Sequence, residues 1–252
     1  METHTTPGAE IRPGTAAGSH LLKIPPGPAG TYRLAQLDDY THLPRSRFPH
    51  RPPRSLRLRA RVSAPDLPGT WGFGLWNDPF SVSLGVSGGT RRLPALPNAA
   101  WFFFASPHNY LSFRDDKPAQ GFLAQTFRSP HLSAPLLALG AATFPMMLLP
   151  PLARRLRPAI RRVVQEDSFA LDLDVTEWHM YTLEWRENSV TFRVDDQTLE
   201  TGISPRPPLG IVIWIDNQYA ALTPDGHLSF GSLANKQSSW LEISDWQGGA
   251  VR

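Results

Sequence analysis

The 252-residue chain contains no cysteine. This absence excludes a disulfide framework, a zinc site built on thiolates and a thiol nucleophile. Other signatures of chemistry are missing as well, since the sequence has no P-loop, no H-E-x-x-H motif and no EF-hand loop. We therefore expect neither a bound metal nor a cofactor.

A strong excess of charge of one sign is also missing. The 25 Lys and Arg residues and the 22 Asp and Glu residues give a formal net charge of +3. Such a mild imbalance does not by itself indicate a nucleic-acid partner. The N-terminus has no basic segment followed by an apolar run, so we expect no signal peptide and a cytoplasmic location.

Proline is abundant, with 26 residues in the chain, and proline at this density excludes long helices over most of the sequence. Short stretches that alternate apolar and polar residues recur between polar turns, a pattern typical of an antiparallel β-sandwich. Residues 55–63 (SLRLRARVS) place Leu56 and Leu58 on one face and Arg57 and Arg59 on the other. The fold class is therefore predicted to be all-β.

The composition also suggests a domain organisation. Residues 1–29 are rich in Pro, Gly, Thr and Ala, and we expect them to form a disordered leader. Residues 30–252 are expected to form one β domain. An apolar and basic insertion, predicted to be partly helical, interrupts this domain at residues 132–165.

The insertion begins with an apolar segment cut by prolines (LSAPLLALGAATFPMMLLPP) and continues with a basic segment (LARRLRPAIRRVV). With its prolines, the apolar part is too short to span a bilayer as a helix. An apolar hairpin followed by a basic helix indicates either peripheral membrane contact through residues 132–164 or a lid. The alternative is an insertion packed on the sandwich with its arginines in water.

Two stretches are expected to lie at the centre of the sheet. Residues 69–80 (GTWGFGLWNDPF) alternate in the manner of a strand, with two internal glycines and a turn at the end. Glycine weakens a strand unless a ligand or another backbone comes close, so this strand is either a core strand with a bulge or the floor of a cleft. Residues 99–106 (AAWFFFAS) are continuously apolar, which predicts burial on both faces.

Several segments resemble glycoside hydrolase family 16. The segment WHMYTLEWRENSVTFRVDDQ resembles the family's Trp-His-x-Tyr-x-x-Glu-Trp strand and the Val-Asp-Gly-type turn that follows it. GTWGFGLW, PLGIVIWIDNQYA and WLEISDWQ resemble other strands of the family and occur in the same order. The resemblance implies the concanavalin A-like lectin/glucanase jelly roll, in which two curved antiparallel sheets form a cleft on the concave side.

The sequence departs from this family at the catalytic motif. The family's retaining chemistry uses Glu-x-Asp-x-x-Glu on one cleft strand, and this motif is absent from the chain. The matching strand, residues 99–106, contains no carboxylate. Standard retaining glycosidase activity is therefore not expected.

The resemblance places a set of mostly aromatic residues in the cleft. The expected ligand-binding residues are Trp71, Trp76, Asn77, Trp101, Phe103, Gln125, Trp214 and Asn217. Asp216 and Asp78 are candidate general acids, and the alternative for each is a turn residue that caps its neighbours. The arginines lie mainly outside this cleft, so no nucleic-acid partner is expected.

These observations leave three functional hypotheses open. The first is a protein that binds a carbohydrate or a hydrophobic small molecule, since aromatic rings stack on sugars and also enclose hydrocarbons. The second is an enzyme that acts on a lipid-like or terpenoid-like substrate with an Asp as general acid. The third is an atypical glycoside hydrolase with displaced carboxylates.

Overall fold

The structure, a computed structural model, describes residues 1–79, 92, 94–133, 135–136 and 144–249. Most strands belong to two seven-stranded antiparallel sheets. Sheet A contains, in spatial order, β1 (Glu2–Thr5), β4 (Leu34–Asp38), β13 (Gly210–Asp216), β6 (Thr70–Trp76), β7 (Ala99–Ala105), β8 (Gly121–Arg128) and β9 (Gln165–Ala170). Sheet B contains β12 (Gln197–Thr201), β11 (Val190–Val194), β10 (His179–Trp185), β5 (Arg54–Val62), β16 (Ser239–Gly249), β3 (His20–Ile24) and β2 (Glu10–Pro13).

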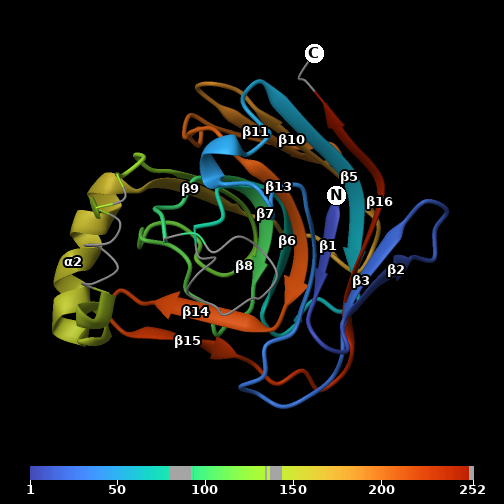
Figure 1. Ribbon diagram of the computed structural model, residues 1–252, viewed down its shortest axis with the longest axis horizontal. Helices are drawn as coiled ribbons and strands as arrows, with labels where there is room; N and C mark the ends of the chain where they lie inside the picture. Colours follow the sequence, from blue (N-terminus) through green and yellow to red (C-terminus); the bar gives the residue numbers. More distant parts are fainter. Residues whose placement is uncertain (80–91, 93, 134, 137–143, 250–252) are drawn as a thin grey trace.

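The two sheets pack face to face, which confirms the predicted β-sandwich jelly roll. Figure 1 shows sheet A as a curved layer beside sheet B. A separate hairpin of β14 (Gln218–Leu222) and β15 (Leu228–Ser232) lies on the side of sheet A that faces away from sheet B. We call that side the concave face.

The alternation of the strands decides which side chains fill the space between the sheets. On β6, Trp71, Phe73 and Leu75 point into this space and are at most 1% exposed. Phe102 of β7 lies 5.5 Å from Phe73 and 5.2 Å from Phe192 of sheet B, measured between ring centroids. Each such ring contributes about 2–3 kcal/mol when it is fully removed from water. These aromatic contacts therefore hold the two sheets together.

The first 29 residues do not form a disordered leader, so that prediction is wrong. Strand β1 pairs with β4, and β3 pairs with β16. Leu22 and Ile24 of β3 have no exposed surface and belong to the core between the sheets. Glycines and prolines occupy the turns around this short apolar strand, as at Gly18, whose φ is 72°. The content of glycine and proline in residues 1–29 therefore reflects their turns, and it gave no indication of the short strand between them.

Other local expectations also differ from the structure. Residues 110–113 have a strand-like sequence but contribute only an isolated bridge between Tyr110 and Ala221. Residues 171–175 alternate like a strand, yet they follow the end of β9 as a loop. Residues 81–89 (SVSLGVSGG) have the sequence of a short strand that ends in a glycine turn, and they lie outside the described residues.

The partly helical insertion is confirmed. A 3-10 helix, η2 (Phe144–Leu148), and an α-helix, α2 (Pro150–Val163), lie between β8 and β9. Proline suits the first helical position, because a backbone N–H at that position would have no hydrogen-bond partner within the helix and its absence costs nothing. No helix within the described ranges is both long enough and apolar enough to cross a membrane.

Candidate functional site

Two glycines of β6 make room for large rings on the concave face. A Cβ atom built on Gly72 would lie 2.9 Å from Cη2 of Trp214, and one on Gly74 would lie 2.5 Å from Cβ of Trp101. Both atoms would also lie 2.4 Å from backbone oxygens of β7. The glycines are therefore required by neighbouring indole side chains and by the close approach of the next strand.

Five aromatic side chains gather above this glycine platform, and we call them the concave cluster. They are Trp76, Trp101, Phe103, Phe127 and Trp214. The rings of Trp76 and Trp214 are nearly parallel at 6.2 Å, and Trp101 lies 5.9 Å from Trp76 and 5.7 Å from Trp214. Sheet A therefore carries apolar side chains on both of its faces, as the continuous apolar run at residues 99–106 predicted.

The concave cluster is covered rather than exposed in an open cleft. Trp101 and Trp214 are each only 7% exposed. Tyr40 and Phe48 come from the loop after β4 and are buried with the cluster, and Val164, just after α2, closes another side. The cover therefore consists of loops and of the α2 segment, while the rings themselves stand on strands.

All three indole N–H groups of the cluster have partners within the protein. Trp76 Nε1 donates to the Tyr40 hydroxyl at 2.7 Å. Trp101 Nε1 donates to Oε1 of Gln125 at 3.1 Å, and Trp214 Nε1 donates to Oγ1 of Thr70 at 3.0 Å. What the cluster offers to a ligand is consequently ring faces and ring edges.

Asp216 lies at the end of β13, on the same face as Trp214. It is 6% exposed, and its Oδ1 accepts hydrogen bonds from the hydroxyl and the backbone N–H of Thr70 at 2.8 and 3.2 Å. Its Oδ2 lies 3.4 Å from the hydroxyl of Tyr32, which can donate to it. Burial raises the pKa of Asp216 to about 7, although the hydrogen bonds from Thr70 act in the opposite direction. The carboxyl group is therefore partly protonated near neutral pH.

The remaining expected site residues have other surroundings. Trp71 points into the core between the sheets, because it is one residue out of phase with the concave face. Asn77 binds the backbone of Leu96 and Asn98, while Asn217 binds the backbone of two segments, one at Thr31 and Arg33 and the other at Leu233. These two amides hold loops in place.

Asp78 is a turn residue, with a φ of 47°. Its Oδ2 accepts a hydrogen bond from the Arg92 guanidinium at 2.6 Å. Arg92 also donates to the carbonyl oxygens of Tyr40, Thr41 and Leu43. Arg92 therefore links the loop after β6, which also contains Asp78, to the loop after β4.

Sequence reasoning missed several residues of this region. Phe127 follows Gln125 by two positions on β8, so strand periodicity alone could have placed it beside Trp101. Tyr32 lies in the loop before β4, and Tyr40 and Phe48 lie in the loop after it. Loops lack the alternation of apolar and polar residues that assigns a strand residue to one face. Thr70 immediately precedes Trp71 and could have been assigned to the concave face by the same alternation.

The carboxylates of the concave face are spread over the sheet. On the β4–β13 pair, Asp38 is opposite Val212 and Asp216 is opposite Leu34, so the two lie at different ends of the pair. Glu166 of β9 is four strands away from β13 and accepts hydrogen bonds from Ser112 and from backbone N–H groups. Neither Asp38 nor Glu166 is a cross-strand neighbour of Asp216.

Comparisons with known proteins give only distant similarities. No protein-family model matches the chain, and no curated protein matches it. LamAcat from Zobellia galactanivorans is similar in structure, with a TM-score of 0.44 and 11% identity, over 91% of this chain and 76% of that one. A Bacillus licheniformis β-glucanase is similar with a TM-score of 0.42 and 11% identity, over 98% of this chain and 94% of that one. A legume lectin-like domain from Entamoeba histolytica is similar with a TM-score of 0.42 and 9% identity, over 100% of this chain and 97% of that one.

Proposed function

We propose that this protein binds an apolar small molecule at the concave cluster. The observation that carries the proposal is the gathering of five aromatic side chains on the face of sheet A that lies outside the sandwich core. Ligand sites are mostly apolar and aromatic, with a few polar groups that fix the orientation of the ligand. Here Asp216, Thr70 and Tyr32 supply such a polar group at one end of the cluster.

The satisfied indole groups favour an apolar ligand over a sugar. A sugar needs many convergent hydrogen-bonding side chains, whereas the N–H groups of Trp76, Trp101 and Trp214 are already occupied. An apolar molecule needs only contact with ring faces, and each ring removed from water contributes about 2–3 kcal/mol. The ligand class that fits is lipid-like or terpenoid-like.

Entry of the ligand requires displacement of loops. The cover above the cluster comes from loop residues such as Tyr40 and Phe48 and from the α2 segment. Loops open locally at a lower free-energy cost than paired central strands. The sheet can therefore stay intact while the ligand replaces part of the cover.

The test is a tryptophan-fluorescence titration with two probes. One is farnesol, a C15 isoprenoid alcohol, and the other is a β-glucan tetrasaccharide. Farnesol is expected to bind, and Trp214→Phe is expected to weaken it about fivefold or more through lost contact area. Trp246→Phe is the matched control, since Trp246 is 40% exposed on β16. Binding of the tetrasaccharide and not of farnesol would contradict the proposal.

A second candidate function is acid catalysis on the bound molecule by Asp216. The observation that favours it is a carboxyl group with a pKa of about 7, because a general acid works best when its pKa is near the operating pH. Nearby rings could stabilise a cationic intermediate through cation–π contact. Asp78 fits this role less well, because its carboxylate already binds Arg92.

Replacement of Asp216 separates the two functions. Asp216→Asn keeps the shape of the side chain but removes the transferable proton. An enzyme would lose turnover and keep its affinity, whereas a binding protein would keep its affinity and have no turnover in either form. The separation of Asp38, Glu166 and Asp216 on the sheet favours both candidates over a retaining glycosidase, whose carboxyl groups lie about 5 Å apart.

A further inference from the structure

The insertion between β8 and β9 carries exposed apolar side chains next to exposed arginines. Met146, Leu148 and Leu149 are 47%, 53% and 60% exposed. They come from η2 and from the residue that precedes α2, and we call them the apolar step. The helix that follows has no acidic residue in its first turn and none in its whole length.

The inner side of α2 is fixed to the sandwich. Ala153 is fully buried, and Arg157 is only 4% exposed. The Arg157 guanidinium forms an ion pair with Asp115, donates to the carbonyl of Ser112 at 2.8 Å and lies over the ring of Tyr110. These contacts hold one side of the helix against the sandwich, so the opposite side faces outward.

The outer side of α2 is basic. Pro151, Arg155, Pro158 and Arg162 are spaced by three or four residues, so they lie along one face of the helix, and all four are exposed. We call them the basic face. Within the part of the chain that the structure describes, neither Arg155 nor Arg162 has a carboxylate at ion-pair distance. Their charges are therefore available to a partner.

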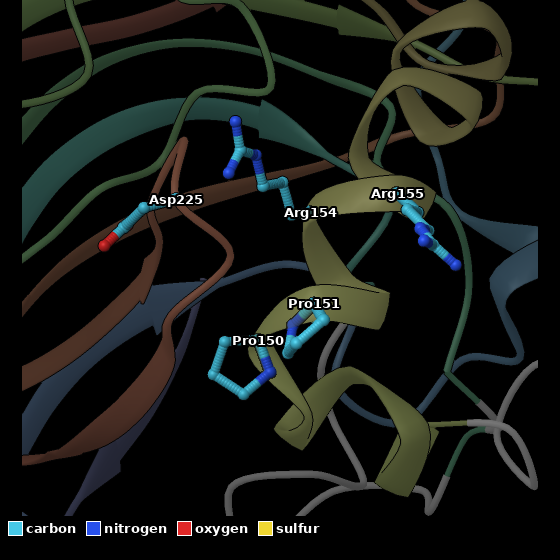
Figure 2. A pocket seen from close by; sticks show the side chains of 5 residues that line it. All are labelled: Pro150, Pro151, Arg154, Arg155 and Asp225. Atoms are coloured by element: carbon cyan, nitrogen blue, oxygen red, sulfur yellow. The ribbon is translucent and has the colours of Figure 1, made fainter.

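A hollow of about 500 Å³ lies between the start of α2 and the β14–β15 hairpin. Figure 2 shows the side chains of Arg154 and Asp225 at this hollow, with Pro150 and Pro151 at the first turn of the helix and Arg155 on the other side of the ribbon. The carboxylate of Asp225 is bonded to Thr223 and to His227. Arg154, like Arg155, is exposed and has no ion-pair partner among the described residues.

We propose that the apolar step and the basic face dock the protein on an anionic lipid bilayer. Interfacial segments place apolar side chains at the boundary of the acyl chains while basic residues meet the lipid phosphates. The positive charge of the basic face is complementary to an anionic lipid surface. Adjacent exposed leucines suit a fluid acyl layer, which needs no matching groove. None of the residues of the apolar step or of the basic face belongs to the concave cluster.

Vesicle sedimentation of the full chain tests the proposal. The protein is expected to pellet with phosphatidylserine-containing vesicles and not with pure phosphatidylcholine. Leu148→Ser/Leu149→Ser and Arg155→Gln/Arg162→Gln are each expected to lower the partition coefficient about tenfold or more. The matched controls lie on sheet B, with Trp246→Ser for lost apolar surface and Arg57→Gln/Arg193→Gln for lost charge. Both controls should bind like the unmodified protein.

A fluorescence measurement checks the depth of the contact independently of these variants. Because the chain has no cysteine, Leu149→Cys can carry one environment-sensitive dye, and Thr198→Cys on β12 is the control position. A blue shift on addition of anionic vesicles is expected at position 149 alone.

Three results would overturn the proposal. They are no binding to anionic vesicles, equal binding to neutral ones, and unchanged binding by either double variant. Absence of vesicle binding together with retention on polyglutamate would instead assign an acidic protein as the partner of this surface.

Discussion

Asp216 illustrates how the position of one residue on a strand sets its chemistry. It ends a strand whose other face belongs to the sandwich core, and it is buried beside Thr70 and Tyr32. Burial disfavours the charged carboxylate, so its pKa rises to about 7. The sequence indicated Asp216 as a candidate acid, but the partners that surround it come from distant segments.

This pKa predicts a specific dependence of stability on pH. The folded protein holds the Asp216 proton more tightly than the unfolded chain, whose pKa is about 3.9. At a pH below the pKa of the unfolded chain, the Asp216 carboxyl group is neutral in both states, and its burial does not lower the free energy of unfolding. The free energy of unfolding then falls as the pH rises from about 4 to about 7. The loss is on the order of 4 kcal/mol at most.

Urea unfolding at pH 5 and pH 8 measures this effect. Asp216→Asn should remove the loss, so the stability of the variant relative to the original protein should increase with pH. A difference that stays constant between pH 5 and pH 8 would argue against a raised pKa at this position.

The glycines of β6 provide a second prediction at the residue scale. In Gly74→Ala the added Cβ would lie 2.4 Å from the carbonyl oxygen of Ala100 and 2.5 Å from Trp101 Cβ. We expect a loss of about 1–3 kcal/mol or more, as for other overpacked sites, and a changed near-UV circular dichroism spectrum. Gly202→Ala is the control, since nothing lies within 4 Å of its added Cβ. Equal stability of the two variants would contradict the packing described for the concave face.

At the scale of elements, strand periodicity identified most of the central strands. Residues 55–63 and 99–106 correspond to β5 (Arg54–Val62) and β7 (Ala99–Ala105) within one or two residues. The hairpin β14–β15 was missed, because Gln218–Leu222 has no clear alternation of apolar and polar residues. The N-terminal strands were missed because glycine and proline dominate the turns between them.

The N-terminal strands give the prediction that belongs to this scale. Leu22 of β3 is fully buried, so Leu22→Ala should lower the free energy of unfolding by about 2–5 kcal/mol. Leu136→Ala, at a side chain that is 53% exposed, should change it by less than about 0.5 kcal/mol. Thermal or urea unfolding compares the two. Full stability after Leu22→Ala would mean that the first strands contribute nothing to the sandwich.

At the scale of the whole molecule, the sequence indicated a sandwich and an aromatic concave face. It did not reveal which tryptophan lies on which face, because a shift of one residue in register exchanges the two faces of a strand. Trp71 therefore belongs to the core, whereas Trp76 and Trp214 belong to the concave cluster. The cover over the cluster was also unpredictable, since loops such as the one that contains Tyr40 and Phe48 carry no periodic pattern.

The central claim is that the concave cluster holds an apolar molecule. Native mass spectrometry of the protein, incubated with farnesol and a β-glucan tetrasaccharide together, tests it most directly. We predict a one-to-one complex with farnesol that Trp214→Phe weakens and Trp246→Phe leaves unchanged. A complex with the tetrasaccharide alone, or a farnesol complex that Trp214→Phe does not affect, would contradict the claim.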